Sequence, residues 1–310
     1  MQITIVTAQA QQYVNALSPR FPQCQWFFAE DASLLSQAAL TSEILLATPN
    51  EAAKIIKQMP NLQWLHSSFA GVDALLKRHL PQHYKLTNSR GVFGPLMSEY
   101  VFSFLLAHTQ QHNIYQHQQQ QALWQALPSI SLQGLTFCCV GSGNISQHLA
   151  TTANHFGMRT VALSHSGAAK AAFTQVANFE QHKQICATAK VVVAVLPNTP
   201  QTLGLLNEKF FASLDDEVVF FNVGRGDTVD QAALLAFLQA KPKATAILDV
   251  TSPEPLPKTH PLWSQDNCII TPHVAAPSRV SDIIELFASK LKDHLAGKEL
   301  TDRVDFSKGY

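Results

Sequence analysis

Short apolar segments alternate with longer stretches of helical spacing along most of the chain. In the first ninety residues the apolar segments are bounded by polar or proline-containing stretches, which is typical of buried strands. Such an alternation of strand-like and helix-like segments predicts a parallel sheet with covering helices. The strands predicted for this first sheet are Ile3–Val6, Cys24–Phe28, Ile44–Ala47, Leu62–Leu65 and Lys85–Thr87.

The pattern changes near Gly91, where a long helical stretch begins. Pro95 suits the first helical position, and helical spacing continues to about Gln120. Seven glutamines between positions 110 and 121 fit the polar end of this helix, because glutamine is a good helix former. A low-complexity interaction tract is the alternative interpretation of these glutamines. We predict a domain boundary at the start of this helix.

A second alternation follows Gly134 and predicts a second doubly wound sheet, again with helices between its strands. The last segment, residues 281–294, has apolar residues at helical spacing and should pack back onto the first domain. The chain is therefore predicted to be an α/β protein with two doubly wound parallel-sheet domains. The strands predicted for the second sheet are Leu135–Val140, Thr160–Leu163, Val191–Leu196, Val218–Val223, Ala246–Val250 and Cys268–Thr271.

Length and composition support two globular domains and exclude several classes of partner. A chain of 310 residues exceeds the size at which one core usually keeps growing. Lys plus Arg (22) equals Asp plus Glu (22), so the chain lacks the positive field that binds nucleic acid. No segment approaches the ~18 apolar residues of a membrane span. We expect neither nucleic acid nor a membrane as partner, and a cytoplasmic location. Five cysteines without metal-site spacing predict reduced thiols and no metal.

The second alternation opens with a strand, a glycine turn and a helix. Gly141 permits a tight turn, and Gly143 lets the backbone approach a pyrophosphate. The helix that starts near Asn144 and Ile145 offers free N–H groups to an anion. Ser146 stands at the third position, where glycine or alanine is usual. This context predicts a dinucleotide-binding loop, and a simple structural turn is the alternative.

The end of the next strand bears on which nicotinamide cofactor the loop would bind. NAD-binding versions carry an acidic residue there, about 20 residues after the glycine loop. This chain instead has Ser164, His165 and Ser166, with no carboxylate. Two hydroxyls and an imidazole can hydrogen-bond a 2′-phosphate, and no anion repels it. NADP is therefore favoured over NAD, although no arginine is present in the segment.

Three late motifs place a charged or titratable residue just after a predicted strand. These residues are Arg225, Glu254 and His273. The carboxyl ends of parallel strands form the rim where ligands bind in an open doubly wound sheet. The three side chains are therefore candidates for one active site at that rim.

The ordered motifs resemble those of the D-isomer-specific 2-hydroxyacid dehydrogenase family. The resemblance covers most of the chain and implies an oxidoreductase that transfers a hydride between NAD(P)H and a small 2-oxo acid or D-2-hydroxy acid, similar to glyoxylate/hydroxypyruvate reductases. It implies a flavodoxin-like substrate domain (1–92 with 275–310), a Rossmann NAD(P)-binding domain (93–274) and a homodimer built around the long helix after residue 94. Besides the loops above, the matching segments are Ser67–Asp73, Arg90–Gly94, Glu99–Val101, Leu196–Pro200 and Pro261–Trp263.

Reduction of a 2-oxo acid needs positive charge for the carboxylate and a proton donor for the forming alkoxide. Arg225 suits the carboxylate and the carbonyl oxygen because its guanidinium offers a planar fork of donors. His273 suits proton transfer because imidazole titrates near physiological pH. Glu254 should orient the imidazole and favour its cationic form. The alternatives are a surface salt bridge for Arg225 and a solvated loop position for Glu254.

The resemblance implies roles for further residues. A loop of four residues resembles the family loop whose backbone N–H groups bind the substrate carboxylate, and its phenylalanine either restricts the pocket or faces the core. Asp249 resembles the residue that holds the nicotinamide carboxamide, although a strand-end carboxylate could equally cap a loop. The loop residues are Phe69, Ala70, Gly71 and Val72, and the other implied cofactor contacts are Leu196, Pro197, Val223 and Ala275.

A dinucleotide-sensing binding protein of corepressor type, without turnover, is the alternative function. Fold alone cannot exclude it, but the complete set of Arg225, Glu254 and His273 favours an enzyme. Only about 37 residues follow His273, which disfavours a phosphoglycerate dehydrogenase with an appended regulatory domain. The glutamate at position 254 disfavours a formate dehydrogenase, where glutamine is typical, and leaves phosphite oxidation open.

Overall fold

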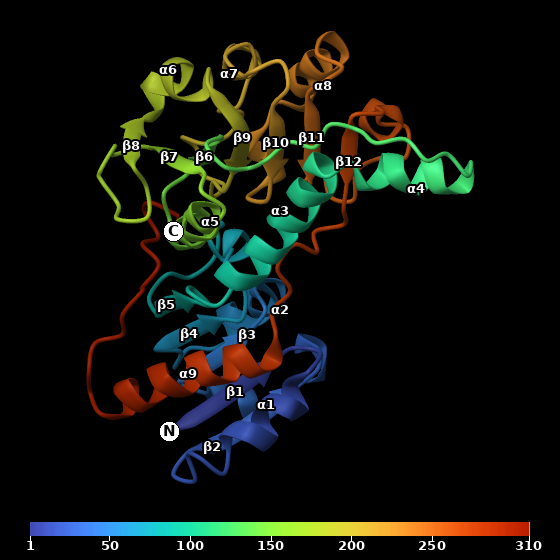
Figure 1. Ribbon diagram of the computed structural model, residues 1–310. Coiled ribbons are helices and arrows are strands. Elements are labelled where there is room, and N and C mark those ends of the chain that lie inside the picture. The colour runs from blue at the N-terminus through green and yellow to red at the C-terminus, as the bar shows by residue number, and fades with distance from the viewer. Residues whose placement is uncertain (310) are drawn as a thin grey trace. The chain divides into compact units, whose positions relative to one another are not determined.

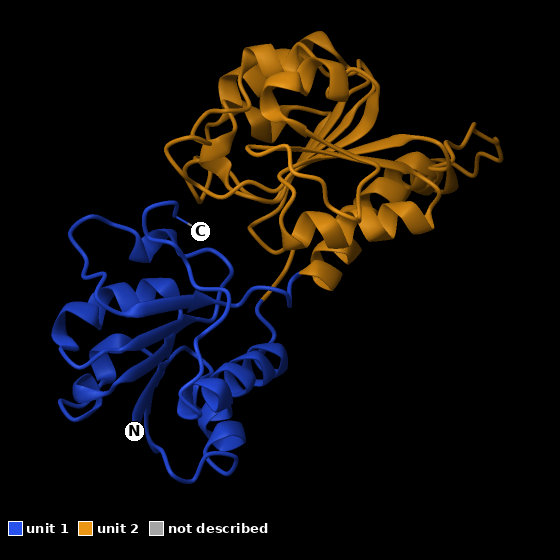
Figure 2. Cartoon of the chain, turned by 90° about the vertical axis from the view of Figure 1, so that its left-hand side faces the viewer, with its two compact units in different colours: residues 1–93, 278–310 blue, residues 94–277 orange. Residues whose placement is uncertain are grey.

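The computed structural model describes residues 1–309 and divides into two compact units. Unit 1 comprises residues 1–93 and 278–310, and unit 2 comprises residues 94–277 (Figure 2). Each unit contains one parallel β-sheet with helices packed on it. The predicted α/β fold class is therefore confirmed.

Unit 1 is built on a five-stranded sheet with the order β2-β1-β3-β4-β5 and parallel pairing throughout. This is the strand order of flavodoxin-like folds. All five strands predicted for this sheet are found, with their ends within two residues of the expected positions. They are β1 (Gln2–Val6), β2 (Gln25–Ala29), β3 (Ile44–Ala47), β4 (Trp64–Ser67) and β5 (Lys85–Asn88).

Three α-helices belong to unit 1: α1 (Ala10–Leu17), α2 (Pro49–Ile55) and α9 (Val280–Leu295). The last helix packs against α1 and buries its apolar stripe, as its spacing predicts (Figure 1). Successive residues of β4 face opposite sides of the sheet. Trp64 stacks on Phe287 of α9, whereas Leu65 joins the core formed with α2.

Unit 2 is built on a seven-stranded parallel sheet with the order β12-β11-β10-β9-β6-β7-β8. The chain starts in the middle at β6, runs outward to β8, then returns to β9 and runs outward the other way. The strand order thus reverses between β6 and β9, which is the switch point where doubly wound sheets bind ligands. The strands are β6 (Thr136–Val140), β7 (Arg159–Ser164), β8 (Gln175–Asn178), β9 (Ala189–Ala194), β10 (Val219–Asn222), β11 (Thr245–Leu248) and β12 (Cys268–Ile270).

Helices cover both faces of this sheet. On one face α3 packs against α5, and their apolar side chains share a core with alternate residues of β6, such as Phe137 and Cys139. The other face carries Cys138 and Val140. None of the helices within residues 1–309 is both long and apolar enough to cross a membrane. The α-helices are α3 (Gly94–Thr109), α4 (His112–Gln120), α5 (Asn144–His155), α6 (His182–Cys186), α7 (Glu208–Phe211) and α8 (Gln231–Ala240).

Two predictions about unit 2 were wrong. The prediction missed β8, the edge strand, because Ala177 is its only buried residue and its ends are polar, so it has no apolar run. The single helix expected from Pro95 to about Gln120 is two helices. The first ends at Thr109, and Gln111 has a left-handed φ of 60° before α4 begins. The glutamine-rich segment has no continuous apolar face to pack against the rest of unit 2. Packing therefore does not require it to continue α3 as one straight helix.

Candidate active site

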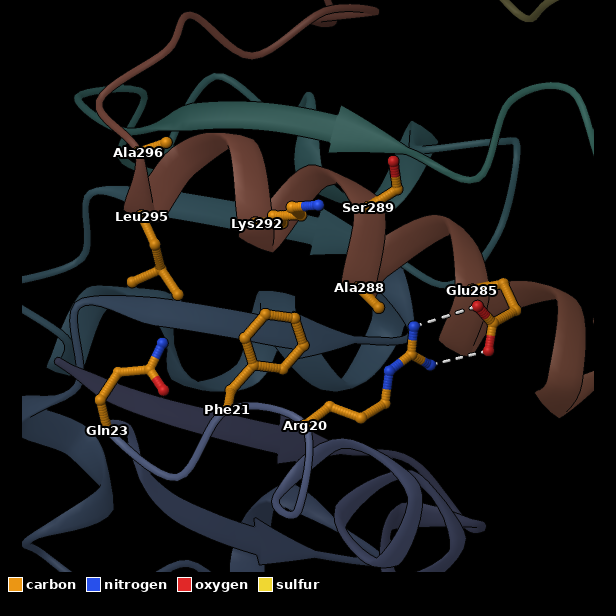
Figure 3. Close-up of a pocket in the computed structure, with 9 residues that line it drawn as sticks. All are labelled: Arg20, Phe21, Gln23, Glu285, Ala288, Ser289, Lys292, Leu295 and Ala296. Atoms are coloured by element: carbon orange, nitrogen blue, oxygen red, sulfur yellow. Dashed lines mark hydrogen bonds and ion pairs between the residues drawn. The ribbon is translucent and has the colours of Figure 1, made fainter.

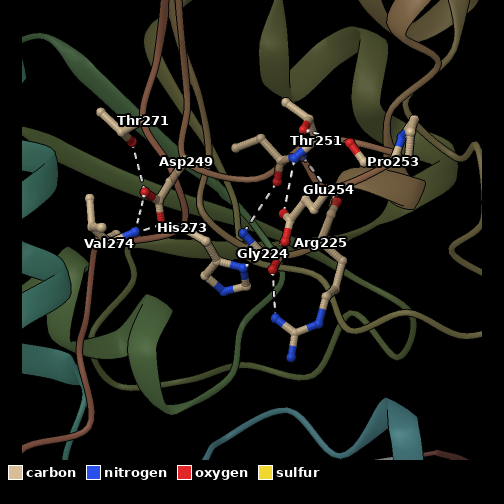
Figure 4. Close-up of polar contacts among 11 residues, drawn as sticks. Gly224, Arg225, Asp249, Thr251, Pro253, Glu254, Thr271, His273 and Val274 are labelled. Carbon is tan, nitrogen blue, oxygen red and sulfur yellow. Dashed lines mark hydrogen bonds and ion pairs between the residues drawn. The ribbon is translucent and has the colours of Figure 1, made fainter. Parts of the chain in front are cut away.

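Arg225, Glu254 and His273 follow three strands that are neighbours in the sheet of unit 2. They lie beyond the carboxyl ends of β10, β11 and β12, which pair in parallel. Parallel neighbours end at the same edge of a sheet, so residues 29 and 19 positions apart in sequence come together here. Figure 4 shows the guanidinium of Arg225 and the imidazole of His273 extending from the loops toward the same side.

Two glycines fix the backbone on either side of Arg225. A Cβ added to Gly224 would lie 2.7 Å from the backbone N and O of Leu196, and a Cβ added to Gly226 would overlap the carbonyl of Thr251. The loop after β10 therefore passes between the loops after β9 and β11 with no room for side chains. Arg225 projects from this confined segment with its side chain only partly buried.

Hydrogen bonds also hold the Arg225 main chain. Its carbonyl oxygen accepts from Asn222 Nδ2 at 3.0 Å and from Thr228 Oγ1 at 2.7 Å. Its own Nη1 donates to the Gly224 carbonyl at 2.7 Å. This bond orients the guanidinium, whose planar fork of five N–H donors suits an anionic ligand.

His273 and Glu254 form a hydrogen-bonded pair. Nδ1 of His273 lies 3.0 Å from Oε2 of Glu254, and Oε1 of Glu254 accepts from the backbone N–H of Thr251 at 3.1 Å. A carboxylate only accepts hydrogen bonds, so Nδ1 carries the proton of this bond, and Nε2 is the ring nitrogen left for other contacts. The side chains are 54% and 40% exposed, so the pair contributes little to stability and acts by orienting the ring.

The backbone of His273 is left-handed, with φ of 55°. Its N–H donates to the carbonyl oxygens of Asp249 at 2.9 Å and Thr271 at 3.0 Å. Left-handed backbone is uncommon for residues other than glycine, although histidine adopts it more often than most. The turn is therefore held by its contacts with the end of β11.

Asp249 caps this turn with its carboxylate. The side chain is 3% exposed, and its oxygens accept hydrogen bonds from Thr271 Oγ1 (2.7 Å), the N–H of Val274 (2.7 Å) and the N–H of Ala275 (3.0 Å). These contacts are those of a loop cap, which is one of the two interpretations of Asp249 that the sequence allowed. A contact of this carboxylate with the nicotinamide carboxamide stays a prediction.

The glycine turn after β6 lies at the switch point of the sheet and suits a pyrophosphate. Gly141 has φ of 109°, and a Cβ there would lie 2.7 Å from the carbonyl oxygen of Val195. A Cβ on Gly143 would meet nothing within 4 Å, so protein packing does not require this glycine. Gly143 precedes α5, whose first N–H groups have no side-chain cap. Ser146 is fully buried and its hydroxyl has no partner among the described residues, so its small size is what suits the position.

The turn after β7 presents hydroxyls and no carboxylate. Ser164 Oγ accepts from the N–H of Gly167 at 3.1 Å, and Ser166 Oγ accepts from the N–H of Ala168 at 3.3 Å. Both hydroxyls keep their own proton for donation. The carbonyl of His165 is fixed by Asn178 Nδ2 at 2.7 Å.

The other predicted cofactor residues lie at the same carboxyl edge. Asn144 and Ile145 form the first turn of α5, Leu196 and Pro197 follow β9, and Val223 follows β10. Ala275 is buried in the turn that Asp249 caps. The structure thus gathers the predicted cofactor residues around the ends of β6, β7 and β9–β12.

The predicted substrate loop lies in unit 1, directly after β4. Asn88 Nδ2 donates to the carbonyl of Ala70 at 2.6 Å. The N–H groups of Ala70, Gly71 and Val72 have no hydrogen-bond partner among residues 1–309. Phe69 is 44% exposed, so it does not belong to the hydrophobic core. Consecutive N–H groups of this kind can bind a carboxylate.

Comparison with known proteins agrees with this geometry. The family model for the D-isomer specific 2-hydroxyacid dehydrogenase, NAD binding domain, matches residues 102–275. The chain belongs to this family. It is therefore an NAD(P)-dependent 2-hydroxyacid dehydrogenase, an oxidoreductase acting on CH–OH groups, with a small 2-oxo acid and a dinucleotide as its ligands. The prediction of an enzyme is confirmed.

Individual relatives cover most of the dehydrogenase. It is 33% identical over 248 residues to the glyoxylate/hydroxypyruvate reductase A of Yersinia enterocolitica, covering 78% of this chain and 79% of that protein. A solved D-isomer specific 2-hydroxyacid dehydrogenase family protein from Aeromonas salmonicida is 37% identical, with a TM-score of 0.91 over 98% of this chain and 99% of that one. The NADPH-dependent glyoxylate/hydroxypyruvate reductase of Sinorhizobium meliloti, solved with NADP and sulfate, is 25% identical, with a TM-score of 0.88 over 100% of both chains.

No sequence pattern indicated a role for Asp227, which links three loops of the dehydrogenase. Its carboxylate accepts from Asn198 Nδ2 at 2.9 Å and from Ser252 Oγ. These partners follow β9 and β11, whereas Asp227 follows β10. Asp227 therefore fixes the spacing of the loops that carry Arg225 and Glu254, and only the folded chain makes this visible.

Tyr100 lies in the segment Glu99–Val101, which resembles the family, but the sequence did not indicate its contact in the fold. Its hydroxyl lies 2.6 Å from Oγ1 of Thr271, which in turn contacts Asp249. Burial raises the pKa of Tyr100 to about 12. The two residues are 171 positions apart, so no local pattern could have indicated the contact.

A surface groove in unit 1 contains none of the predicted site residues. It lies between α9 and the segment after α1, with Phe21 and Leu295 on its walls and Lys292 at its side (Figure 3). Arg20 and Glu285 form a two-pronged ion pair there at 2.7 and 3.1 Å. Both side chains are exposed, so the pair contributes little to stability.

Proposed function

We propose that this dehydrogenase reduces glyoxylate and hydroxypyruvate, with NADPH preferred over NADH. The observation that carries the proposal is the convergence of Arg225, Glu254 and His273 beyond three neighbouring strands, with the imidazole 3.0 Å from the carboxylate. The Yersinia enterocolitica and Sinorhizobium meliloti reductases, named for these two substrates, support the choice.

The three catalytic residues divide the work of the reaction in this proposal. The guanidinium of Arg225 binds the substrate carboxylate and polarises the carbonyl oxygen. When bound, the nicotinamide cofactor would supply the hydride that the carbonyl carbon receives. The Nε2–H of His273 gives its proton to the carbonyl oxygen as the C–O double bond becomes a single bond, and neutral Nε2 takes that proton back during oxidation. Glu254 accepts from Nδ1–H throughout and stabilises the imidazolium.

The loop of unit 1 is the proposed second carboxylate-binding element. The N–H groups of Ala70, Gly71 and Val72 are the donors, since no described residue uses them. Phe69, which is exposed at the start of this loop, is the residue we propose to limit the size of the substrate side chain.

The preference for NADPH rests on the turn after β7. Ser164, His165 and Ser166 offer donors and carry no negative charge to repel a 2′-phosphate. The solved Sinorhizobium meliloti relative holds NADP. We assign Gly141, Gly143 and the start of α5 to the pyrophosphate, since a side chain at Gly143 would fill open space that a phosphate can approach.

We also propose a homodimer, with unit 1 as the substrate domain and unit 2 as the dinucleotide-binding domain. The α4 helix and the segment after it extend from the rest of unit 2 (Figure 1) and expose apolar side chains, which a second copy could cover. The most exposed is Trp124. Free thiols at all five cysteines suit the cytoplasm as the proposed location. Light scattering coupled to size-exclusion chromatography would give the mass of the assembly.

The function is tested by measuring NADPH and NADH consumption with glyoxylate, hydroxypyruvate, pyruvate and bulkier 2-oxo acids. We expect the two named substrates with NADPH to give the highest kcat/KM. The variant His273→Ala should lose at least about 100-fold in kcat and retain NADPH binding. His155→Ala, at an exposed histidine of α5 in the same unit, is the matched control.

Two results would overturn the proposal. Near-normal turnover by His273→Ala would remove this residue from the chemistry. Absence of turnover with every 2-oxo acid, together with tight dinucleotide binding, would support a binding protein instead.

A further inference from the structure

A chain of hydrogen bonds leads from helix α3 to the backbone of His273. The hydroxyl of Tyr100 lies 2.6 Å from Thr271 Oγ1, and Thr271 Oγ1 lies 2.7 Å from Asp249 Oδ1. The carboxylate then accepts from the N–H group of Val274 (Figure 4) and from the N–H group of Ala275. Every member of this chain lies in unit 2.

The direction of donation along the chain is fixed. A carboxylate only accepts, so the Thr271 hydroxyl must donate its one proton to Asp249. The Thr271 oxygen can then only accept from Tyr100. Burial keeps the Tyr100 phenol protonated by raising its pKa to about 12, which suits it as the donor.

The chain ends on the residues that set the conformation of His273. The left-handed turn is held by the Asp249 carbonyl on the N–H of His273 and by the Asp249 carboxylate on the next two N–H groups. Pro272 before it has no N–H to contribute. The side chains of Pro272, His273 and Val274 are exposed, so packing does little to hold the turn.

We propose that Tyr100 is a positioning residue for His273, acting through Thr271 and the carboxylate of Asp249. The inference rests on the proposed catalytic role of His273. Tyr100 acts indirectly: it fixes the rotamers of Thr271 and Asp249, and these two fix the turn. The catalytic imidazole then faces its substrate in one orientation.

The test uses Tyr100→Phe, which keeps the ring and its packing 4.9 Å from Phe104. Loss of one hydroxyl that orients the chain should lower kcat about three- to tenfold, with unchanged KM for NADPH. Thr271→Val should have a similar effect, and Thr271→Ser, which keeps the hydroxyl, should restore most of kcat. The double variant Tyr100→Phe/Thr271→Val should be no slower than the slower single variant.

Tyr84→Phe is the matched control. Tyr84 is buried in unit 1, and its hydroxyl has no hydrogen-bond partner among the described residues. The kcat of the Tyr84→Phe variant should equal that of the wild type. Thermal unfolding of all variants separates positioning from stability, because a merely structural Tyr100 would lower Tm and leave kcat unchanged.

The outcomes separate this inference from the proposed function. Unchanged kcat in Tyr100→Phe, or multiplicative losses in the double variant, would overturn the positioning role while His273→Ala remains inactive. If His273→Ala is itself active, the proposed function fails first.

Discussion

Alanine substitutions at the two glycines of the turn after β6 should affect different properties. Gly141→Ala should lower the folding stability, whereas Gly143→Ala should weaken NADPH binding. Gly141 has φ of 109° and a Cβ there would approach the Val195 carbonyl to 2.7 Å, so Gly141→Ala should cost about 1–3 kcal/mol for the conformation alone and more for the overlap. A Cβ on Gly143 meets nothing within 4 Å. As the residue before α5, Gly143→Ala should cost no more than about 1 kcal/mol of folding stability.

At Gly143 we expect the alanine substitution to weaken NADPH binding even though it changes the folding stability little. A methyl group there would keep a pyrophosphate from the free N–H groups of α5. Loss of one charge-assisted hydrogen bond of about 1.5–3 kcal/mol corresponds to about 10- to 150-fold weaker NADPH binding. The measurements are urea unfolding for stability and NADPH fluorescence titration for affinity, both on the whole chain.

Gly134→Ala is the control for backbone strain. Gly134 has φ of 80° with open space around its Cβ position, and it precedes β6 at the opposite end from the turn. It should lose stability and keep its affinity for NADPH. If Gly143→Ala binds NADPH as tightly as the wild type, the assignment of this turn to the pyrophosphate is wrong.

Three further predictions follow from single side chains. Arg225→Lys should lower kcat/KM about 100-fold while NADPH binding persists, because a point charge does not replace a planar fork; a loss below about threefold would contradict the assignment. Ser164→Asp should keep the acceptor for Gly167 N–H but repel a 2′-phosphate, so the ratio of NADPH to NADH affinity should fall at least about tenfold, and an unchanged ratio would refute the cofactor preference. Burial lowers the pKa of His66 to about 3, so between pH 6.5 and 3 the unfolded chain binds a proton that the folded chain does not. Stability should therefore fall on acidification, by about 2 kcal/mol from pH 6.5 to 5, with a smaller fall in His66→Gln; equal urea midpoint shifts in both proteins would show that His66 is not the group responsible.

Hydrophobic patterning predicted those parts of the fold that are buried on both sides. The strands β6 and β10 consist almost entirely of apolar residues, so their positions could be read directly. The pattern failed where burial is slight. Edge strand β8 buries only Ala177, and the break near Gln111 separates a packed helix from one whose only buried residue is Gln118. Neither feature has an apolar period to read.

The candidate site also contains residues that the sequence indicated and residues that it did not. Arg225, Glu254 and His273 could be proposed because each follows a recognisable strand in a familiar order. The residues that fix their backbone could not. Asp227 and Tyr100 act across loops and helices distant in sequence, and their roles depend on contacts that only the folded sheet brings together.

The composition of unit 1 from both ends of the chain has a consequence for its synthesis. The last strand of its sheet ends at Asn88. Helix α9 and the segment in which Arg303 pairs with Thr87 follow unit 2 in the sequence, after residue 277. The roughly 180 residues of unit 2 must be translated in between, which takes about 10–40 s at about 5–20 residues per second. During that time the face of β4 that receives Phe287, with Trp64 on it, has no helix to cover it. The growing chain therefore carries an exposed aromatic surface on the ribosome until α9 emerges, and this interval is when chaperones would be needed most.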